Sequence, residues 1–187
     1  SHRVQRLRVW FGKLGELALL GHLDLMKAFD RAVRRADLPI SFTGGYHPKP
    51  RISPANALPL GTTSSGEIAD FDMAEAIDID IFRQKLAACL PEELPIYRVE
   101  AVDVKSPSVS QVLDRAESVI GAAVNGGPAT REDWETWVRQ VLEQTEILWE
   151  KTTKSGKIRT INLREQLLTL EVISADTAGG ATLRYVG

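Results

Sequence analysis

The chain has 187 residues, 43% of them hydrophobic, and a formal net charge of −2 at pH 7, which is an ordinary composition for a globular protein with an apolar core. Its single cysteine, Cys89, excludes an internal disulfide and any zinc or iron–sulfur centre that needs several cysteine ligands from this chain. We find no signal peptide, apolar span or lipidation motif, so we expect a cytoplasmic location and no membrane association.

The charge is unevenly distributed along the chain. Residues 3–61 hold ten cations and four anions, whereas residues 62–104 hold ten anions and three cations. The low net charge can therefore hide a basic surface that binds anions. Two solvated faces of opposite charge explain the same distribution equally well, and both interpretations stay open at this point.

The first half of the chain alternates strand and helix patterns. Asp70 and Asp72 alternate with apolar residues in one of the predicted strands, and we interpret them as exposed, solubilising residues that protect a sheet edge. The predicted elements are a strand over 7–11, a helix over about 22–36, a short edge-like piece over 40–42, an extended segment over 52–58, a strand over 67–73, a helix that begins at Asp78 or Asp80, and a strand over 96–104.

The second half of the chain predicts another α+β unit. Thr130 is expected to cap a helix, with Asp133 in the reciprocal position of a capping box. The other predicted elements are a short helix over 109–115, a strand over 117–124, a hairpin of 146–152 with 158–161, and a second hairpin of 167–173 with 181–186.

Together these patterns predict an α+β fold of two ferredoxin-like subdomains of the βαββαβ type. We assign residues 3–104 to the first subdomain and place the boundary in the polar connection that follows. Residues 105–187 form the second subdomain, which lacks its last helix, so we expect it to be incomplete at its C-terminus within a larger protein.

A basic helix and the loop that follows it are the main candidate binding site. The predicted helix carries Lys27, Arg31, Arg34 and Arg35 outside its apolar positions, a stripe that can follow a phosphate backbone. The loop Gly44-Gly45-Tyr46-His47-Pro48-Lys49-Pro50-Arg51 adds a ring for base stacking, an imidazole and two cations. A solvated helix face and a tyrosine folded onto the core are the alternatives, and both stay open at this point.

A second group of cations lies on the predicted hairpin near residue 155. Lys151, Lys154, Lys157 and Arg159 could form a basic ribbon that enters nucleic acid. Hairpin tips are commonly charged, however, and we favour that ordinary explanation slightly.

His22 and His47 are the only histidines beyond His2. If they approach each other, they could act as acid and base on a phosphodiester, with Lys49 or Arg51 stabilising the developing charge. Structural roles for both rings, one at the helix start and one in a turn, are the alternative that we favour. A metal site is not expected, because Asp24 would point about 200° away from His22 on a helix.

Several motifs of the chain resemble those of one known family. The matching runs are Arg8-Val9-Trp10-Phe11, Gly21-His22-Leu23-Asp24-Leu25-Met26-Lys27-Ala28-Phe29-Asp30-Arg31-Ala32, Leu38-Pro39-Ile40, Gly45-Tyr46-His47-Pro48-Lys49-Pro50-Arg51-Ile52-Ser53 and Leu58-Pro59-Leu60-Gly61. They resemble the radical-SAM-linked bacterial domain of unknown function. The resemblance covers the first hundred residues, and its most specific part is the Gly-Tyr-His-Pro loop. Residues 152–157 resemble the family's basic turn, but Asn162-Leu163-Arg164-Glu165 departs from the expected Asp-hydrophobe-Arg-Pro.

The resemblance implies a radical S-adenosylmethionine (radical-SAM) domain as partner, in cis or in trans, which would hold the iron–sulfur cluster and S-adenosylmethionine. With one cysteine, this chain cannot supply the cluster's cysteine triad. We expect no cofactor and no catalysis in this chain alone. The tandem plan is also similar to CRISPR-RNA-processing endonucleases, although a fold does not fix a function.

Three hypotheses follow. The first is an RNA-binding or substrate-presenting accessory domain of a radical-SAM RNA-modification system. The second is a metal-independent ribonuclease that uses His22 and His47. The third is a protein-interaction module that docks a radical-SAM domain. For the first, the candidate RNA-binding residues are Lys27, Arg31, Arg34, Arg35, Tyr46, His47, Lys49, Arg51, Lys154 and Lys157.

Overall fold

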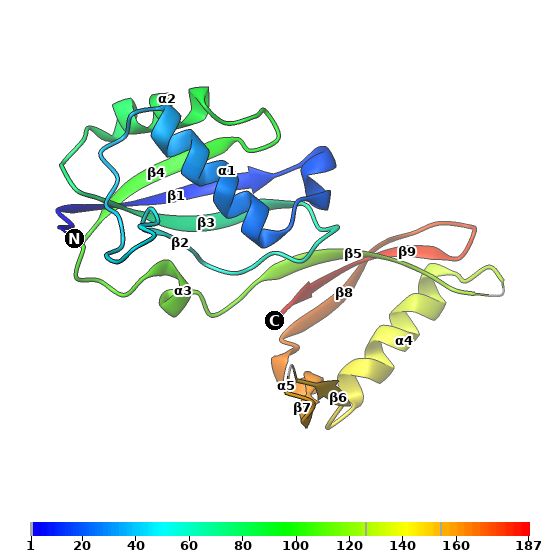
Figure 1. The fold of residues 1–187 in the computed structure, drawn as a ribbon. Helices are drawn as coiled ribbons and strands as arrows, with labels where there is room; N and C mark the ends of the chain where they lie inside the picture. The colour runs from blue at the N-terminus through cyan, green and yellow to red at the C-terminus, as the bar shows by residue number, and fades with distance from the viewer. Residues whose placement is uncertain (1, 126, 154) are drawn as a thin grey trace. The chain divides into compact units, whose positions relative to one another are not determined.

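The protein is a mixed α+β chain built on antiparallel sheets (Figure 1). Its structure, a computed structural model, describes residues 2–125, 127–153 and 155–187. The chain divides into two compact units, the first running to Leu113 and the second beginning at Asp114. Within the described residues, no helix is long and apolar enough to cross a membrane.

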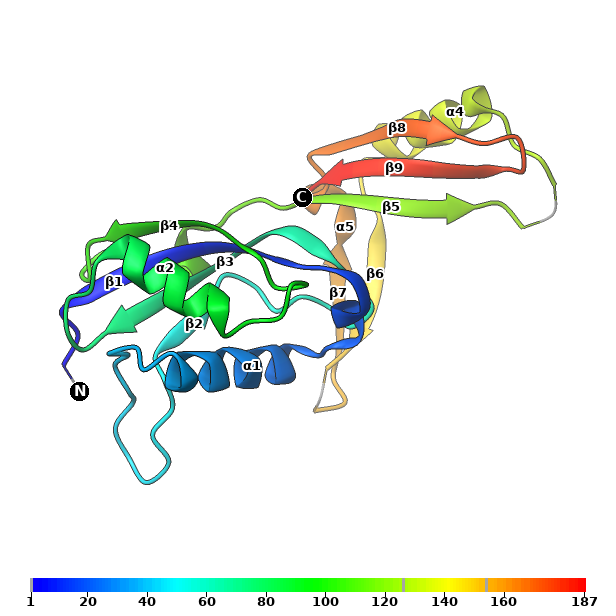
Figure 2. The ribbon, with the colours of Figure 1, turned by 90° about the horizontal axis from the view of Figure 1, so that it is seen from above.

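The first unit is an antiparallel sheet with both of its long helices on one face (Figure 2). The strand order is β2-β3-β1-β4, and each pair of neighbours is antiparallel. The elements are β1 (Gln5–Lys13), the 3₁₀ helix η1 (Gly15–Leu19), α1 (His22–Arg35), β2 (Ile52–Pro54), β3 (Ser64–Met73), α2 (Ile79–Ala88), β4 (Ile96–Val102) and α3 (Val109–Val112).

Phenylalanine rings form the centre of the first core. Phe29 of α1 packs edge-on against Phe11 of β1 and Phe71 of β3, with ring centroids 5.0 and 5.6 Å apart. Phe71 in turn contacts Phe82 of α2 at 5.7 Å. All four rings are buried. The apolar residues that alternate along the strands and those at helical spacing in α1 therefore hold the helices on one face of the sheet.

Both long helices of the first unit have clear local end signals. The Asp78 carboxylate accepts hydrogen bonds from the backbone N–H groups of Asp80 and Ile81, which confirms Asp78 as the N-cap of α2. At the end of α1, Asp37 has φ 49°. This left-handed conformation cannot continue a right-handed helix, so α1 ends there.

The opposite face of the first sheet carries buried ion pairs. Asp70 is only 2% exposed, and its carboxylate accepts two hydrogen bonds from Arg8, at 2.8 and 3.0 Å. Hydrogen bonding to Asp70 raises the pKa of the Arg8 guanidinium. Asp72 is also buried, and Arg6 donates to it at 2.7 Å. The expectation that both aspartates are exposed is therefore wrong.

Both aspartates are buried, and not exposed as expected, because residues 105–113 cover them. The backbone N–H of Val109 donates to the Asp70 carboxylate at 2.7 Å, and Arg6 donates to the carbonyl of Ser106 at 2.8 Å. Residues 105–113 therefore belong to the first unit, although their polar composition suggested a connection to the second.

The second unit combines a three-stranded sheet with a separate two-stranded hairpin. The sheet order is β5-β9-β8, and α4 packs against β8. The side chains of Thr130 and Asp133 form the predicted capping box at the start of α4. The elements are β5 (Glu117–Ala123), α4 (Arg131–Glu143), β6 (Leu148–Thr152), β7 (Ile158–Asn162), α5 (Leu163–Gln166), β8 (Thr169–Ala175) and β9 (Gly180–Val186).

Arg164 anchors the base of the β6–β7 hairpin. Its guanidinium donates to the carbonyls of Leu142, Gln144 and Leu167 at 3.1, 3.2 and 3.0 Å. Asn162 accepts a hydrogen bond from the N–H of Ile147 at 2.9 Å. Residues 162–165, which depart from the Asp-hydrophobe-Arg-Pro motif expected from the family resemblance, therefore have a structural role.

Candidate nucleic-acid interface

The basic stripe of α1 lies on the surface of the first unit. Lys27, Arg31, Arg34 and Arg35 are all exposed, while Leu25, Phe29, Ala32 and Val33 are buried against the sheet. Spacing of four residues places Lys27, Arg31 and Arg35 on one side of the helix. The structure thus presents these cations to solvent.

Two cations of the stripe already have partners. Lys27 pairs with Asp24 at 2.9 Å and Arg34 pairs with Asp30 at 2.6 Å. Arg31 and Arg35, in contrast, form no ion pair or side-chain hydrogen bond with any described residue. They are the helix cations that an external anion can bind without displacing an internal carboxylate.

The loop after α1 is closed at its base and projects from the unit (Figure 2). The N–H of Thr43 donates to the carbonyl of Lys49 at 2.8 Å, and the Lys49 N–H donates to the Thr43 hydroxyl at 3.0 Å. Gly45 has φ 105°, a conformation that residues with a side chain rarely adopt. The tip is therefore a defined turn with exposed side chains.

Tyr46 is the most prominent side chain of this tip. It is 96% exposed, and its ring meets that of His47 edge-on, with centroids 5.5 Å apart. The tyrosine is thus not folded onto the core. Lys49 is also exposed, and its ammonium group forms no ion pair or hydrogen bond with another described residue. A ring, an imidazole and an ammonium group therefore face solvent from one short loop.

Arg34 and Arg51 connect the loop to the body of the unit. The guanidinium carbon of Arg34 lies 4.8 Å from the ring centroid of Phe42, which pairs with Pro50 at the base of the loop. Arg51 is half-buried, and its Nε donates to the carbonyl of Phe42 at 3.3 Å. Arg51 therefore belongs to the base of the loop, below the exposed tip.

The two histidines occupy opposite ends of α1. His22 is the first residue of the helix and is half-buried, with no hydrogen-bond partner for its Nδ1 in the described structure. His47 is exposed on the loop after the helix ends. A helix of 14 residues is about 20 Å long, and both views show the loop beyond its C-terminal end (Figures 1 and 2). The structure does not bring the two imidazoles together.

The remaining predicted residues lie in the second unit. Lys157 is exposed at the turn between β6 and β7, whereas Lys154 lies outside the described residues. Trp149, on the same hairpin, is not among the residues predicted from the sequence. The spacing could have indicated it, because Trp149 and Lys151 are two residues apart in a predicted strand and must therefore share a face.

Another overlooked feature is a group of exposed leucines near the start of α1. Leu19, Leu23 and Leu60 are all more than two-thirds exposed. The N–H of Gly61 donates to the carbonyl of Ala18 at 2.7 Å, which holds Leu60 beside η1. Leu23 lies outside the apolar positions of the helix, and that mismatch was the signal in the sequence.

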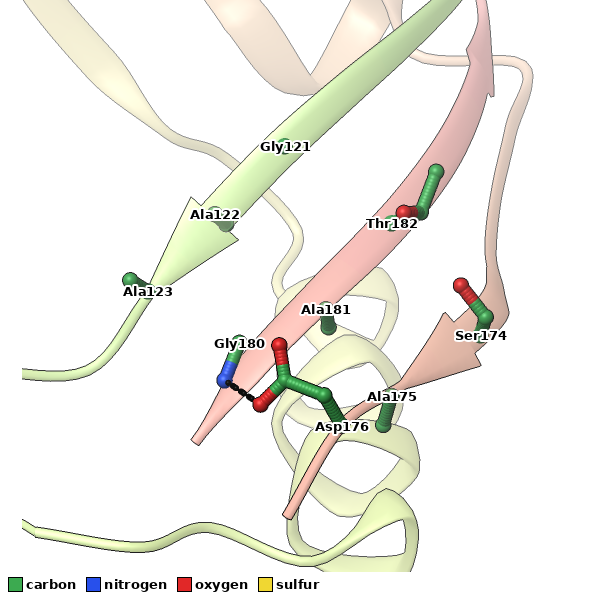
Figure 3. Close-up of a pocket in the computed structure, with 9 residues that line it drawn as sticks. All are labelled: Gly121, Ala122, Ala123, Ser174, Ala175, Asp176, Gly180, Ala181 and Thr182. Carbon is green, nitrogen blue, oxygen red and sulfur yellow. Dashed lines mark hydrogen bonds between the residues drawn. The ribbon is translucent and has the colours of Figure 1, made fainter. Parts of the chain in front are cut away.

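A hollow on the sheet of the second unit is a weaker candidate (Figure 3). Its only charged lining residue is Asp176, whose Oδ1 accepts hydrogen bonds from the N–H groups of Ala178 and Gly180 at 2.8 and 2.9 Å. The Asp176 carboxylate therefore stabilises the turn to which it belongs. Among the described residues there is also no group of three or more histidine, cysteine or acidic side chains that could hold a metal ion.

Comparison with known protein families gives a match over nearly the whole chain. The model of a family described as an uncharacterized protein conserved in bacteria, DUF2344, matches residues 6–187. No curated protein matches the chain.

Proposed function

The chain belongs to the DUF2344 family, and we propose that it is an RNA-binding or substrate-presenting accessory domain of a radical-SAM RNA-modification system in the cytoplasm. The observation that carries the proposal is the pairing pattern of the first unit. Arg31, Arg35 and Lys49 are exposed cations with no ion pair or side-chain hydrogen bond to another described residue, and Tyr46 is exposed three residues before Lys49 on the closed loop.

The chemistry of these residues suits single-stranded RNA. Arginine and lysine side chains on one helix and the following loop can each neutralise a phosphate, which makes binding dependent on salt. An exposed tyrosine can stack on an unpaired base, a contact that a base pair within a duplex does not offer. A loop closed by backbone hydrogen bonds loses little conformational freedom on binding, which favours affinity.

We also propose that both units are variants of the ferredoxin-like fold. In support, the order β2-β3-β1-β4 with two helices on one face follows the βαββαβ plan. The order β5-β9-β8, with α4 between β5 and β8 in sequence, repeats the arrangement of its first three strands.

The radical-SAM part of the proposal rests on the sequence resemblance. A partner domain, in cis or in trans, would hold the iron–sulfur cluster and S-adenosylmethionine, since this chain has one cysteine. The role left for this chain is to bind the RNA and position it for that partner.

Fluorescence anisotropy with a labelled single-stranded RNA of mixed sequence tests the proposal. We expect Arg31→Ala, Arg35→Ala and Lys49→Ala each to weaken binding at low salt. Lys105→Ala is a matched control, because Lys105 is exposed in the segment that covers the other face of the sheet. No binding by the wild-type chain at low salt, or equal effects of Lys49→Ala and Lys105→Ala, would contradict the proposal.

The exposed leucines favour a second candidate function, a module that docks the radical-SAM domain. Leu19, Leu23 and Leu60 are large apolar side chains exposed on η1, at the start of α1 and beside η1, and exposed apolar residues that gather on a surface often mark a protein contact. Co-purification of the two proteins tests this function. We expect Leu23→Asp to abolish co-purification while leaving RNA binding unchanged, and retention of the complex by Leu23→Asp would contradict it.

A further inference from the structure

We propose that the β6–β7 hairpin is a second RNA-binding element, in which Trp149 stacks on an unpaired base while Lys151 and Arg159 bind the phosphates that flank it. This inference rests on the proposed function, because it names another surface for the same ligand. It concerns the second unit, so its test can be separated from that of the basic helix and loop.

The strand register places these three side chains on one face of the hairpin. Lys151 lies directly opposite Arg159, and the neighbouring pair on the same face is Trp149 opposite Ile161. Residues that face each other in an antiparallel pair share a face, as do residues two apart in a strand. The indole therefore lies next to two cationic side chains.

The Lys151–Arg159 pair is unfavourable by itself. Like charges directly opposite each other on a ladder destabilise a hairpin. Neither side chain forms an ion pair or a side-chain hydrogen bond with any residue that the structure describes. The nearest carboxylate in sequence, that of Glu150, belongs to the alternate face, opposite Thr160. An external anion that contacts both cations would relieve the repulsion.

Trp149 is also without a partner for its ring. It is 56% exposed, and no other aromatic ring or cation stacks on it among the described residues. Every residue of β6 is exposed, so the strand contributes little to a core. A two-stranded hairpin is only marginally stable alone, and here Arg164 fixes its base to carbonyls at the end of α4. The hairpin is thus anchored at its base, and the side chains of β6 are accessible to a ligand.

Single-stranded RNA fits this surface better than a duplex or an apolar protein surface. An indole flanked by cations matches the common mode of single-strand binding, in which bases stack on aromatic rings and the backbone follows a positive groove. A paired base within a duplex cannot stack on the ring. An apolar protein partner would leave two cations buried without counter-charges, which is costly.

The test uses the full chain and a labelled 12-nucleotide single-stranded RNA in an anisotropy titration at several salt concentrations. The slope of log affinity against log salt is negative, and we expect the double variant Lys151→Ala/Arg159→Ala to reduce its magnitude by about 1.4, the value for two phosphate contacts on a single strand. Arg139→Ala, which removes an exposed cation of α4, should leave the slope unchanged.

Trp149 is tested separately. Trp149→Ala should weaken binding by about 5- to 150-fold without changing the salt slope, because stacking is not ionic. Trp149→Phe should restore most of the affinity. Ile158→Ala, an exposed apolar residue of the same hairpin, is the matched control and should have no effect. Circular dichroism confirms that each variant remains folded.

The outcomes separate this inference from the proposed function. If Lys49→Ala weakens binding but the hairpin variants behave like their controls, the inference is overturned and the first binding surface stands. If only the hairpin variants weaken binding, the inference is supported and the first surface is overturned. Tighter binding to duplex RNA, or equal effects of Trp149→Ala and Ile158→Ala, overturns the stacking role. Absence of RNA binding by the wild type overturns both.

Discussion

Arg34 and Phe42 join the basic helix to the loop that follows it, with the guanidinium carbon 4.8 Å from the ring centroid. Arg34 also pairs with Asp30 along the helix. We predict a coupling energy of about 0.5–1 kcal/mol between Arg34 and Phe42, typical of a cation–π contact at a partly exposed site. A double-mutant cycle of Arg34→Ala and Phe42→Leu in urea unfolding measures it. Additive effects of the two substitutions would show that the contact does not couple helix and loop.

Tyr46 tests the role of the loop tip in base stacking. Its side chain is almost fully exposed, so Tyr46→Ala should leave the free energy of unfolding nearly unchanged. The same substitution should weaken single-stranded RNA binding by about 1–3 kcal/mol, the cost of losing one stacked base. Tyr46→Phe keeps the ring and should bind like the wild type. If Tyr46→Ala also binds like the wild type, the tip has no part in RNA binding.

Asp70 tests the buried ion pairs on the other face of the first sheet. Asp70→Ala leaves the largely buried Arg8 guanidinium and the Val109 N–H without their acceptor. Removing one partner of a buried pair costs about 3–5 kcal/mol. Asp30→Ala breaks an exposed pair in the same unit and should cost less than about 1 kcal/mol. Urea denaturation compares the two variants, and similar losses would contradict the buried role of Asp70.

Asp133 gives a prediction for the pH dependence of stability. Hydrogen bonds from the Thr130 backbone N–H and then from its hydroxyl, both 2.8 Å, hold the pKa of the Asp133 carboxyl below its ordinary value of 3.8. Because the pKa is lower in the folded state, the capping box contributes fully above about pH 3.8, and this contribution is lost as the pH falls through the folded value. A pH titration followed by the NMR signal of the Asp133 side-chain carboxyl carbon should give a pKa below 3.8.

Thr130→Ala provides the control for that titration. The substitution removes the hydroxyl donor but keeps the backbone N–H, which is the larger cause of the shift. The pKa of Asp133 should therefore rise only part of the way toward its ordinary value. An unshifted pKa in the wild-type chain would contradict the capping geometry.

Local patterns predicted most helices and strands. The helix expected over 22–36 is α1, His22–Arg35, because its apolar spacing and the residues that stop it are local signals. The caps at Asp78 and Thr130 are also local, since each side chain reaches N–H groups only two or three residues away. The hairpin of β6 and β7 lies close to its predicted ranges for the same reason.

Long-range contacts explain the errors and the omissions. The alternation in β3 correctly places Asp70 and Asp72 opposite the helices, but nothing local shows that residues 105–113 return to cover them. The ion pairs of Lys27 and Arg34 are local, because their carboxylate partners lie three and four residues away on the same helix, so the sequence contained this signal. The separation of His22 from His47 depends instead on the path of the chain after α1, which only the structure shows.

The central claim is that unpaired cations of the first unit bind the phosphates of single-stranded RNA. The most direct measurement is the salt dependence of RNA affinity for the wild type and for the triple variant Arg31→Ala/Arg35→Ala/Lys49→Ala. Three lost phosphate contacts should reduce the magnitude of the negative slope of log affinity against log salt by about 2, while Lys105→Ala leaves it unchanged. An unchanged slope in the triple variant, or no measurable RNA binding by the wild type at low salt, would contradict the claim.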